Sequence, residues 1–172
     1  QTDLQRTEND LLAAEASVLC PSEFAQAVVS AYLDEQPWFD QVKTFREVYR
    51  ERRDALLESL QALMPAGTSW TIPAGGFYSW LTLPQGLDAT AMLPRAVANL
   101  VAYVPGTGFY VDGQGRQNLR LSYCYPEPDR IREGVRRLAA VIETELELAE
   151  TYVTSHALNR VTGSSVPAPN LQ

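Results

Sequence analysis

Arg120 is the residue of this sequence best suited to a chemical role. It lies in the middle of the stretch NLRLSY (residues 118–123). Leu119 and Leu121 alternate with Arg120 and Ser122, and alternation with period two indicates a strand with one apolar face. Arg120 then lies on the other face, where a guanidinium is costly unless an anion meets it. Its fixed fork of donors suits a carboxylate, held through two parallel hydrogen bonds. The competing interpretation is an arginine on the exposed face of a sheet that pairs with a nearby carboxylate of the protein.

Two glycine-rich segments could bring the backbone close to a ligand. Gly75 and Gly76 lie in PAGGFYSW, and residues 105–115 contain four glycines. Glycine permits a positive φ and a close backbone approach. The plainer interpretations are a tight entry into a strand for the first segment and a long hairpin-like connection for the second. The second segment leads into a strand and not into a helix, so we do not expect a phosphate-binding loop there.

The sequence offers no set of residues for nucleophilic or metal chemistry. His156 is the only histidine, and Cys20 and Cys124 are far apart without CxxC spacing. We therefore expect two reduced thiols, no metal site and no catalytic residue in this chain. The basic run YRERRD (residues 49–54) is expected to be a solvated helix face, with an ion pair between its first arginine and its aspartate.

Composition limits the class of protein and of partner. The 172 residues carry a net charge of −7, which argues against nucleic acid or an anionic membrane as the main partner. No apolar run approaches the roughly 20 residues of a membrane helix. Two cysteines without CxxC spacing and no secretory signal at the N-terminus lead us to expect a cytoplasmic location. The chain begins at Gln1 and has one lysine, Lys43, against thirteen arginines. These two features lead us to expect a piece of a longer protein.

Hydrophobic periodicity predicts an α+β fold. Helical patterns cover residues 7–19, 23–36, 38–64, 88–100 and 127–150. Strand-like patterns cover residues 69–72, 76–83, 100–104 and 119–123. The helix over residues 38–64 is a rod of roughly 40 Å, a length more typical of a link between two domains. Pro94 is expected to break or kink its helix, and the polar residues from Thr151 onward are expected to be disordered.

Five motifs, taken in order, resemble the C-terminal end of class I/II aminotransferases, which are pyridoxal-phosphate enzymes of fold type I. The motifs are YRERRDALLESL, PAGGFYSWLTLP, VAYVPGTGFY, NLRLSY and IREGVRRLAAVI. The resemblance covers about residues 22–148. It is closest to the branch that includes 2-aminoadipate aminotransferases and the aminotransferase-like half of MocR-type regulators.

The resemblance implies a domain organisation and two site residues. Residues 1–37 would end the large domain, residues 38–64 would form the interdomain helix, residues 65–150 would be the small domain, and residues 151–172 would be the tail. The small domain would hold a small antiparallel or mixed sheet covered by helices. Arg120 would grip the α-carboxylate of the amino-acid substrate, and Phe109 would line the substrate side of the loop. The intact enzyme would use pyridoxal 5'-phosphate to transfer an amino group between an amino acid and a 2-oxo acid, as a homodimer.

One departure from the family decides what this chain can do alone. The family holds its cofactor covalently through a lysine that follows a strand of the large domain, whereas Lys43 lies in FDQVKTFRE inside the long helix. We therefore expect the C-terminal portion of an aminotransferase, with no cofactor-binding residue and no activity by itself. Two alternatives stay open: the effector-sensing half of a MocR-type transcription regulator, and a non-catalytic α+β domain that binds a small molecule.

Overall fold

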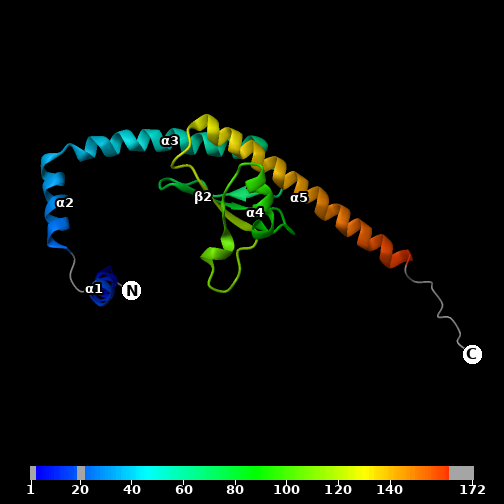
Figure 1. Ribbon diagram of the computed structural model, residues 1–172, viewed down its shortest axis with the longest axis horizontal. Coiled ribbons are helices and arrows are strands. Elements are labelled where there is room, and N and C mark those ends of the chain that lie inside the picture. Colours follow the sequence, from blue (N-terminus) through cyan, green and yellow to red (C-terminus); the bar gives the residue numbers. More distant parts are fainter. Residues whose placement is uncertain (1–2, 19–21, 163–172) are drawn as a thin grey trace, which may run out of the picture. The chain divides into compact units, whose positions relative to one another are not determined.

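The computed structural model describes residues 3–18 and 22–162 of the chain, shown as a ribbon in Figure 1. The chain divides into two compact units, Gln1–Arg46 and Glu47–Gln172. Helix α3 (Trp38–Leu63) passes through the division without interruption. Among the described residues, no helix combines the length and the apolar character that a membrane crossing requires.

The first unit contains α1 (Asp3–Val18) and α2 (Glu23–Glu35). α2 begins where the sequence predicts it, because the Ser22 hydroxyl accepts a hydrogen bond from the Ala25 amide (3.3 Å) and satisfies a free N–H of the first turn. α1 begins earlier than the predicted residue 7. None of the described residues between positions 5 and 46 is buried. The described part of the first unit therefore has no core of its own.

The long helix predicted over residues 38–64 is confirmed by α3. Its buried residues lie on one stripe near the C-terminal end of the helix: Ala55, Leu56, Ser59 and Leu60. Burying the Ser59 hydroxyl leaves no unsatisfied donor, because it donates to the Ala55 carbonyl (2.6 Å). This stripe contributes to the core of the second unit.

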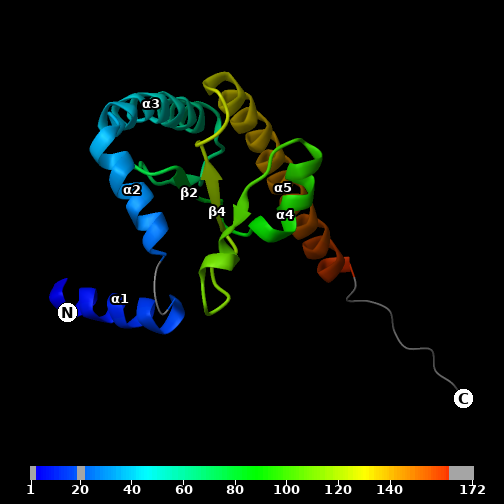
Figure 2. The same ribbon diagram turned by 60° about the vertical axis from the view of Figure 1, so that its left-hand side comes forward.

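Four short strands form an antiparallel sheet in the order β1-β2-β4-β3 (Figure 2). The strands are β1 (Ser69–Trp70), β2 (Tyr78–Thr82), β3 (Val104–Pro105) and β4 (Asn118–Ser122). Leu81 opposes Leu119 across β2 and β4, and Trp80 opposes Arg120. Since successive side chains point to opposite faces, the two leucines lie on one face and Trp80 and Arg120 on the other.

The leucine face of the sheet carries the hydrophobic core. It packs against the end of α3, against α4 (Ala89–Ala98) and against the first half of α5 (Pro128–Thr162). Figure 1 shows α4 and α5 lying together beside the sheet. The largest fully buried side chains are Leu60, Leu81, Leu83, Met92, Leu119, Tyr123, Leu138 and Ile142. Each contributes about 1.5–3 kcal/mol to stability through burial of its apolar surface.

Pro94 is expected to break or kink its helix, and α4 continues through it without a break. The Asp88 carboxylate caps the helix by accepting the Thr90 amide (2.8 Å). Pro94 removes one hydrogen bond from the helix interior. Met92 and Ala96, both buried, flank it in sequence, and their packing holds the helix together across the missing bond.

Two other elements differ from prediction in extent. The strand expected over residues 100–104 is reduced to β3, and Leu100, two residues beyond the end of α4, has a φ of 61°. α5 continues to Thr162 although disorder is expected from Thr151, and no glycine or proline lies between these two residues to end it. Residues 163–172 of the expected tail lie outside the described residues. The α+β fold itself, with a small antiparallel sheet covered by helices, is confirmed.

Candidate functional site

Arg120 lies at the centre of the sheet, on the face that does not carry the core. Its strand, β4, is flanked by β2 and β3, and Arg120 is directly opposite Trp80 on one side and Val104 on the other. Leu119 and Leu121, its neighbours in sequence, are buried in the core. None of the strand residues on the Arg120 face is buried. The structure therefore confirms that the period-two pattern places the guanidinium away from the core.

Among the described residues, no carboxylate forms an ion pair with the Arg120 guanidinium, so the nearby carboxylate of the competing interpretation is not found in this part of the chain. The Nε of Arg120 is buried and has no hydrogen-bond acceptor. Of the strand residues on this face, Arg120 is the only charged one. A charged group without an anionic partner is open to an anion from outside this unit.

Aromatic rings surround this guanidinium. Its Cζ lies over the Tyr78 ring at 4.1 Å from the centroid and over the Phe109 ring at 4.8 Å. Trp80 meets Phe109 edge-to-face with 5.3 Å between ring centroids, and Tyr110 lies 6.3 Å from Trp80 by the same measure. Phe109, which is expected to line the substrate side of its loop, is thus a neighbour of Arg120, and Tyr78 is a second neighbour that the sequence did not single out. The missing signal was the register, which brings Tyr78 near Arg120 from the neighbouring strand.

The loop that carries Phe109 is fixed at its base by close backbone packing. It contains the short 3-10 helix η1 (Gly106–Phe109) and connects β3 to β4. A Cβ on Gly106 would lie 2.5 Å from the Gly115 carbonyl oxygen, so no side chain fits there. The Thr107 and Thr90 hydroxyls share a hydrogen bond (3.3 Å), which ties the loop to α4. The second glycine-rich segment is therefore a packed connection between strands, in line with the plainer interpretation.

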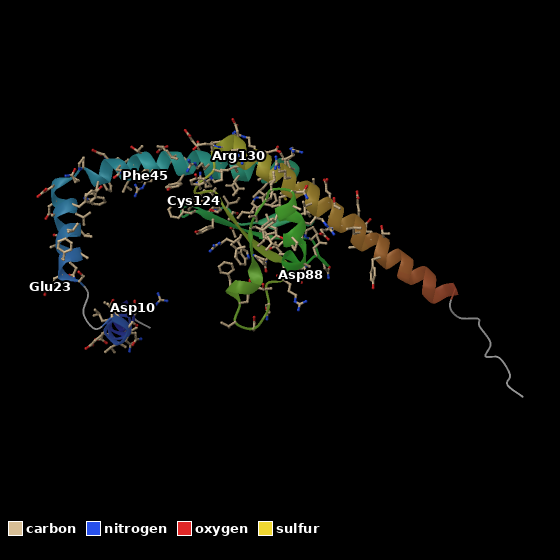
Figure 3. The ribbon with its side chains drawn as sticks, viewed as in Figure 1. Asp10, Glu23, Phe45, Asp88, Cys124 and Arg130 are labelled. Atoms are coloured by element: carbon tan, nitrogen blue, oxygen red, sulfur yellow. The ribbon has the colours of Figure 1, made fainter. Side chains whose placement is uncertain are left out.

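Arg52 holds α3 to the end of β4, and sequence reasoning missed this role. Its Nη1 donates to the Cys124 carbonyl (2.7 Å) and its Nη2 to the Glu127 carboxylate (2.7 Å). Figure 3 labels Cys124 just beyond β4. The expectation of a solvated basic face is wrong at this position. The expected ion pair between Arg50 and Asp54 is wrong as well, because Arg50 pairs with Glu47 and Asp54 with Arg53. The sequence feature that could have indicated this role is the position of Arg52 within the repeat of apolar residues in the helix.

Two buried tyrosines connect the segments around the sheet. The Tyr123 hydroxyl donates to the Gly76 carbonyl (3.0 Å), next to the entry of β2, where Gly76 has a φ of 83°. The Tyr103 hydroxyl donates to the carbonyl of Ala89 at the start of α4 (2.6 Å). Burial raises the pKa of both phenols, and for Tyr103 the negative charges of Glu145 and Asp88 add to the rise. Both groups therefore stay neutral and keep donating.

A cavity of about 360 Å³ opens on the other face of the sheet. Leu121, Ile131 and Leu138 line it, and Arg130, labelled in Figure 3, stands among its lining residues. Ser122, which alternation places on the Arg120 face of β4, also lines the cavity. Arg120, Tyr78 and Phe109 are not among its lining residues, so the cavity is distinct from the candidate carboxylate site.

The described residues do not fit a covalently held pyridoxal phosphate. Lys43, the only lysine of the chain, is exposed and pairs with Asp40 at 2.8 Å. Its Nζ lies over the Phe39 ring at 5.2 Å from the centroid, and Phe39 is one turn earlier in α3. Within the described residues, no cluster of three or more His, Cys, Asp or Glu side chains could hold a metal ion. Among the described residues, Arg120 is the candidate carboxylate-binding group on this face of the sheet, and the single lysine is already paired with Asp40.

Comparisons with known proteins match most of the chain to one family. Residues 6–138 match the family model "Aminotransferase class I and II". The chain is 38% identical over 136 residues to aromatic-amino-acid aminotransferase 1 of Thermococcus litoralis, covering 79% of this chain and 33% of that protein. It is 39% identical over 109 residues to 2-aminoadipate transaminase of Thermus thermophilus, covering 63% and 28%.

A solved aminotransferase structure has a fold similar to that of this chain. The multiple substrate aminotransferase of Thermococcus profundus superposes with a TM-score of 0.73 at 41% identity, over 79% of this chain and 34% of that one. The chain therefore spans about a third of the length of the relatives that it matches. On these matches and on its fold, the chain belongs to the class I and II aminotransferase family.

Proposed function

We propose that this chain is the C-terminal part of a pyridoxal-phosphate-dependent aminotransferase, in which Arg120 grips the α-carboxylate of the amino-acid substrate. The observation that carries the proposal is the guanidinium of Arg120 on the face of the sheet away from the core, where no carboxylate of the described residues pairs with it. A carboxylate ligand would supply the missing charge and accept two parallel hydrogen bonds. Substrate and arginine then meet in a fixed geometry, which is a positioning role and not a chemical one.

The rest of the enzyme supplies what this chain lacks. The lysine and the other groups that hold pyridoxal phosphate lie in a part of the polypeptide outside these 172 residues. Two observations support this division: the chain spans about a third of its relatives, and no described residue between positions 5 and 46 is buried. The exposed apolar residues of α2, among them Phe24 and Val28, pack against that remaining part of the polypeptide. The predicted domain boundaries, the homodimer and the cytoplasmic location belong to the same proposal.

The substrates are an amino acid and a 2-oxo acid. Apart from Arg120, the face of the site is aromatic and uncharged at Tyr78, Trp80 and Phe109. One relative is named an aromatic-amino-acid aminotransferase and another a 2-aminoadipate transaminase. Both names describe carboxylates that carry an amino group, which is the chemistry that a single arginine on this face would recognise.

Expression of the complete reading frame with pyridoxal phosphate tests the proposal. L-Phenylalanine, L-kynurenine and L-2-aminoadipate serve as amino donors and 2-oxoglutarate as acceptor. We expect turnover of at least one donor and the absorbance of lysine-bound cofactor, and neither from the 172-residue chain alone. An upstream winged helix-turn-helix domain together with no turnover would point to a transcription regulator. A complete frame without a cofactor lysine that still binds a carboxylate would point to a non-catalytic binding domain.

A further inference from the structure

The guanidinium of Arg120 is held by aromatic ring faces where arginines in proteins usually have a carboxylate. We propose that Tyr78 and Phe109, here called the aromatic clamp, are positioning residues that orient this guanidinium before the substrate carboxylate arrives. The inference rests on the proposed function, because it concerns how Arg120 is oriented to bind the substrate carboxylate. It assigns a role to two residues that need not touch the substrate.

The contacts of Arg120 show that the rings hold it. Its Cζ lies over the Tyr78 ring at 4.1 Å and over the Phe109 ring at 4.8 Å from the two centroids. Its Nε is buried without an acceptor, so no hydrogen bond at that atom fixes the plane of the group. The two rings come from β2 and from the helix η1 that follows β3, which are the elements on either side of β4. The guanidinium is therefore bracketed by elements on both flanks of its own strand.

Ring faces orient an arginine without using its donors. In a cation–π contact the ring meets the flat face of the guanidinium, and the N–H groups at the edge stay free. A protein carboxylate in the same place would orient the group but would also occupy the donors that a substrate needs. An arginine has a long side chain with several rotatable bonds, and restricting them in advance reduces the entropy lost on binding. The clamp thus keeps the group both ordered and available.

The clamp is itself fixed by neighbouring groups. Tyr78 lies in β2, and its ring meets Phe77 edge-to-face with 6.5 Å between centroids. Phe109 meets Trp80 edge-to-face at 5.3 Å. Its helix η1 begins at Gly106, where no side chain fits, as described above. Each ring, 44% exposed for Tyr78 and 47% for Phe109, thus contacts another aromatic side chain in addition to Arg120.

A spectroscopic experiment tests the clamp without using activity. The intact holoenzyme is labelled with ¹⁵N-arginine, and the Nε–Hε resonance of Arg120 is assigned from its disappearance in Arg120→Lys. Since Cζ lies over two rings, we expect ring currents to shift this resonance upfield in the wild type. The shift should decrease in Tyr78→Leu and persist in Tyr78→Phe, which keeps the ring. An Arg120 resonance at the position of exposed arginines in the wild type overturns the clamp.

A binding experiment tests its consequence. The probe is 3-phenylpropanoate, a carboxylate with an apolar body and no amino group to react, and its Kd is measured for the intact holoenzyme. We expect Tyr78→Leu to raise Kd about fivefold and Tyr78→Phe to leave it within about twofold of the wild type. Tyr125→Leu is the matched control, because Tyr125 is 88% exposed and lines the cavity on the opposite face.

The same experiment in an Arg120→Met background separates the two proposals. If the clamp acts through Arg120, Tyr78→Leu has no further effect once Arg120 is gone. If Tyr78→Leu still weakens binding there, the ring contacts the probe directly and the positioning role is wrong. If Arg120→Met itself leaves Kd unchanged, the proposed carboxylate grip fails, and the resonance of Arg120 still decides whether the rings hold it. A Kd unchanged by Tyr78→Leu in the wild-type background also overturns the inference.

Discussion

Trp80 and Arg120 are directly opposite each other on the two central strands of the sheet, and the adjacent pair, Leu81 and Leu119, is fully buried on the other face. The core pair and the pair at the candidate site are thus one residue apart along the strands, on opposite faces of the sheet. The buried leucine pair fixes the register, since a slip by one residue would bring Arg120 into the core and the leucines out of it. The face on which Arg120 lies is therefore fixed by the same register that builds the core.

Removing the guanidinium of Arg120 should weaken substrate binding in the intact enzyme. We expect Arg120→Lys to raise KM for the amino acid about tenfold and Arg120→Ala about a hundredfold, because the bidentate charged hydrogen bonds are lost. Lysine retains the charge without the planar fork, and alanine retains neither. Steady-state kinetics with L-phenylalanine or the preferred donor measure this. A KM within about twofold of the wild type for Arg120→Ala would remove Arg120 from the site.

A methyl group on Gly106 should disturb the loop that carries Phe109. Its Cβ would lie 2.5 Å from the Gly115 carbonyl oxygen and 2.6 Å from the Asn118 Cβ. We expect Gly106→Ala to lower the free energy of unfolding by about 1–3 kcal/mol, as overpacking does elsewhere. Gly108→Ala is the matched control in the same short helix, because nothing lies within 4 Å of its added Cβ. Equal Tm values for the two variants would show that the loop base tolerates the methyl group.

Arg52 should contribute more to stability than its neighbour Arg50. Arg52 bonds to a backbone carbonyl and a carboxylate across the fold, and only 14% of its side chain is exposed. We expect Arg52→Met to cost about 1–3 kcal/mol, because the Cys124 carbonyl loses its charged donor. Arg50→Met should change stability by about 0.5 kcal/mol or less, since it removes only an exposed pair with Glu47. Urea unfolding measures both, and a similar loss in the two variants would contradict the bracing role of Arg52.

Tyr103 should make stability sensitive to alkaline pH. Burial raises its pKa above that of a phenol in the unfolded chain, so the unfolded state releases the proton first. Its contribution is present in full below about pH 10 and is lost as pH rises through the folded-state pKa. Tyr103→Phe should cost about 1 kcal/mol at pH 7, because the hydrogen bond to Ala89 is gone. Its stability should also fall less steeply than that of the wild type between pH 9 and 11, and an equally steep fall in unfolding titrations would speak against this assignment.

The sequence by itself determined the class of fold and the face on which Arg120 lies. Period-two alternation around Arg120 and the long apolar repeat from Trp38 are local patterns, and burial follows such periodicity directly. The five motifs also predicted the family, which the comparisons confirm. Local patterns failed at Pro94 and from Thr151 to Thr162, where helices continue through or beyond residues expected to end them.

Only the tertiary structure decided what surrounds the guanidinium. Tyr78 is 42 residues from Arg120 in the chain, and pairing of β2 with β4 brings them together. Arg52 reaches Cys124 and Glu127 in the same way, across 72 and 75 residues. No local periodicity encodes such contacts, because they depend on the register between strands and on how a helix packs against the sheet. The absence of a protein carboxylate beside Arg120, among the described residues, is likewise a property of the folded arrangement, and it is the observation on which the proposed function rests.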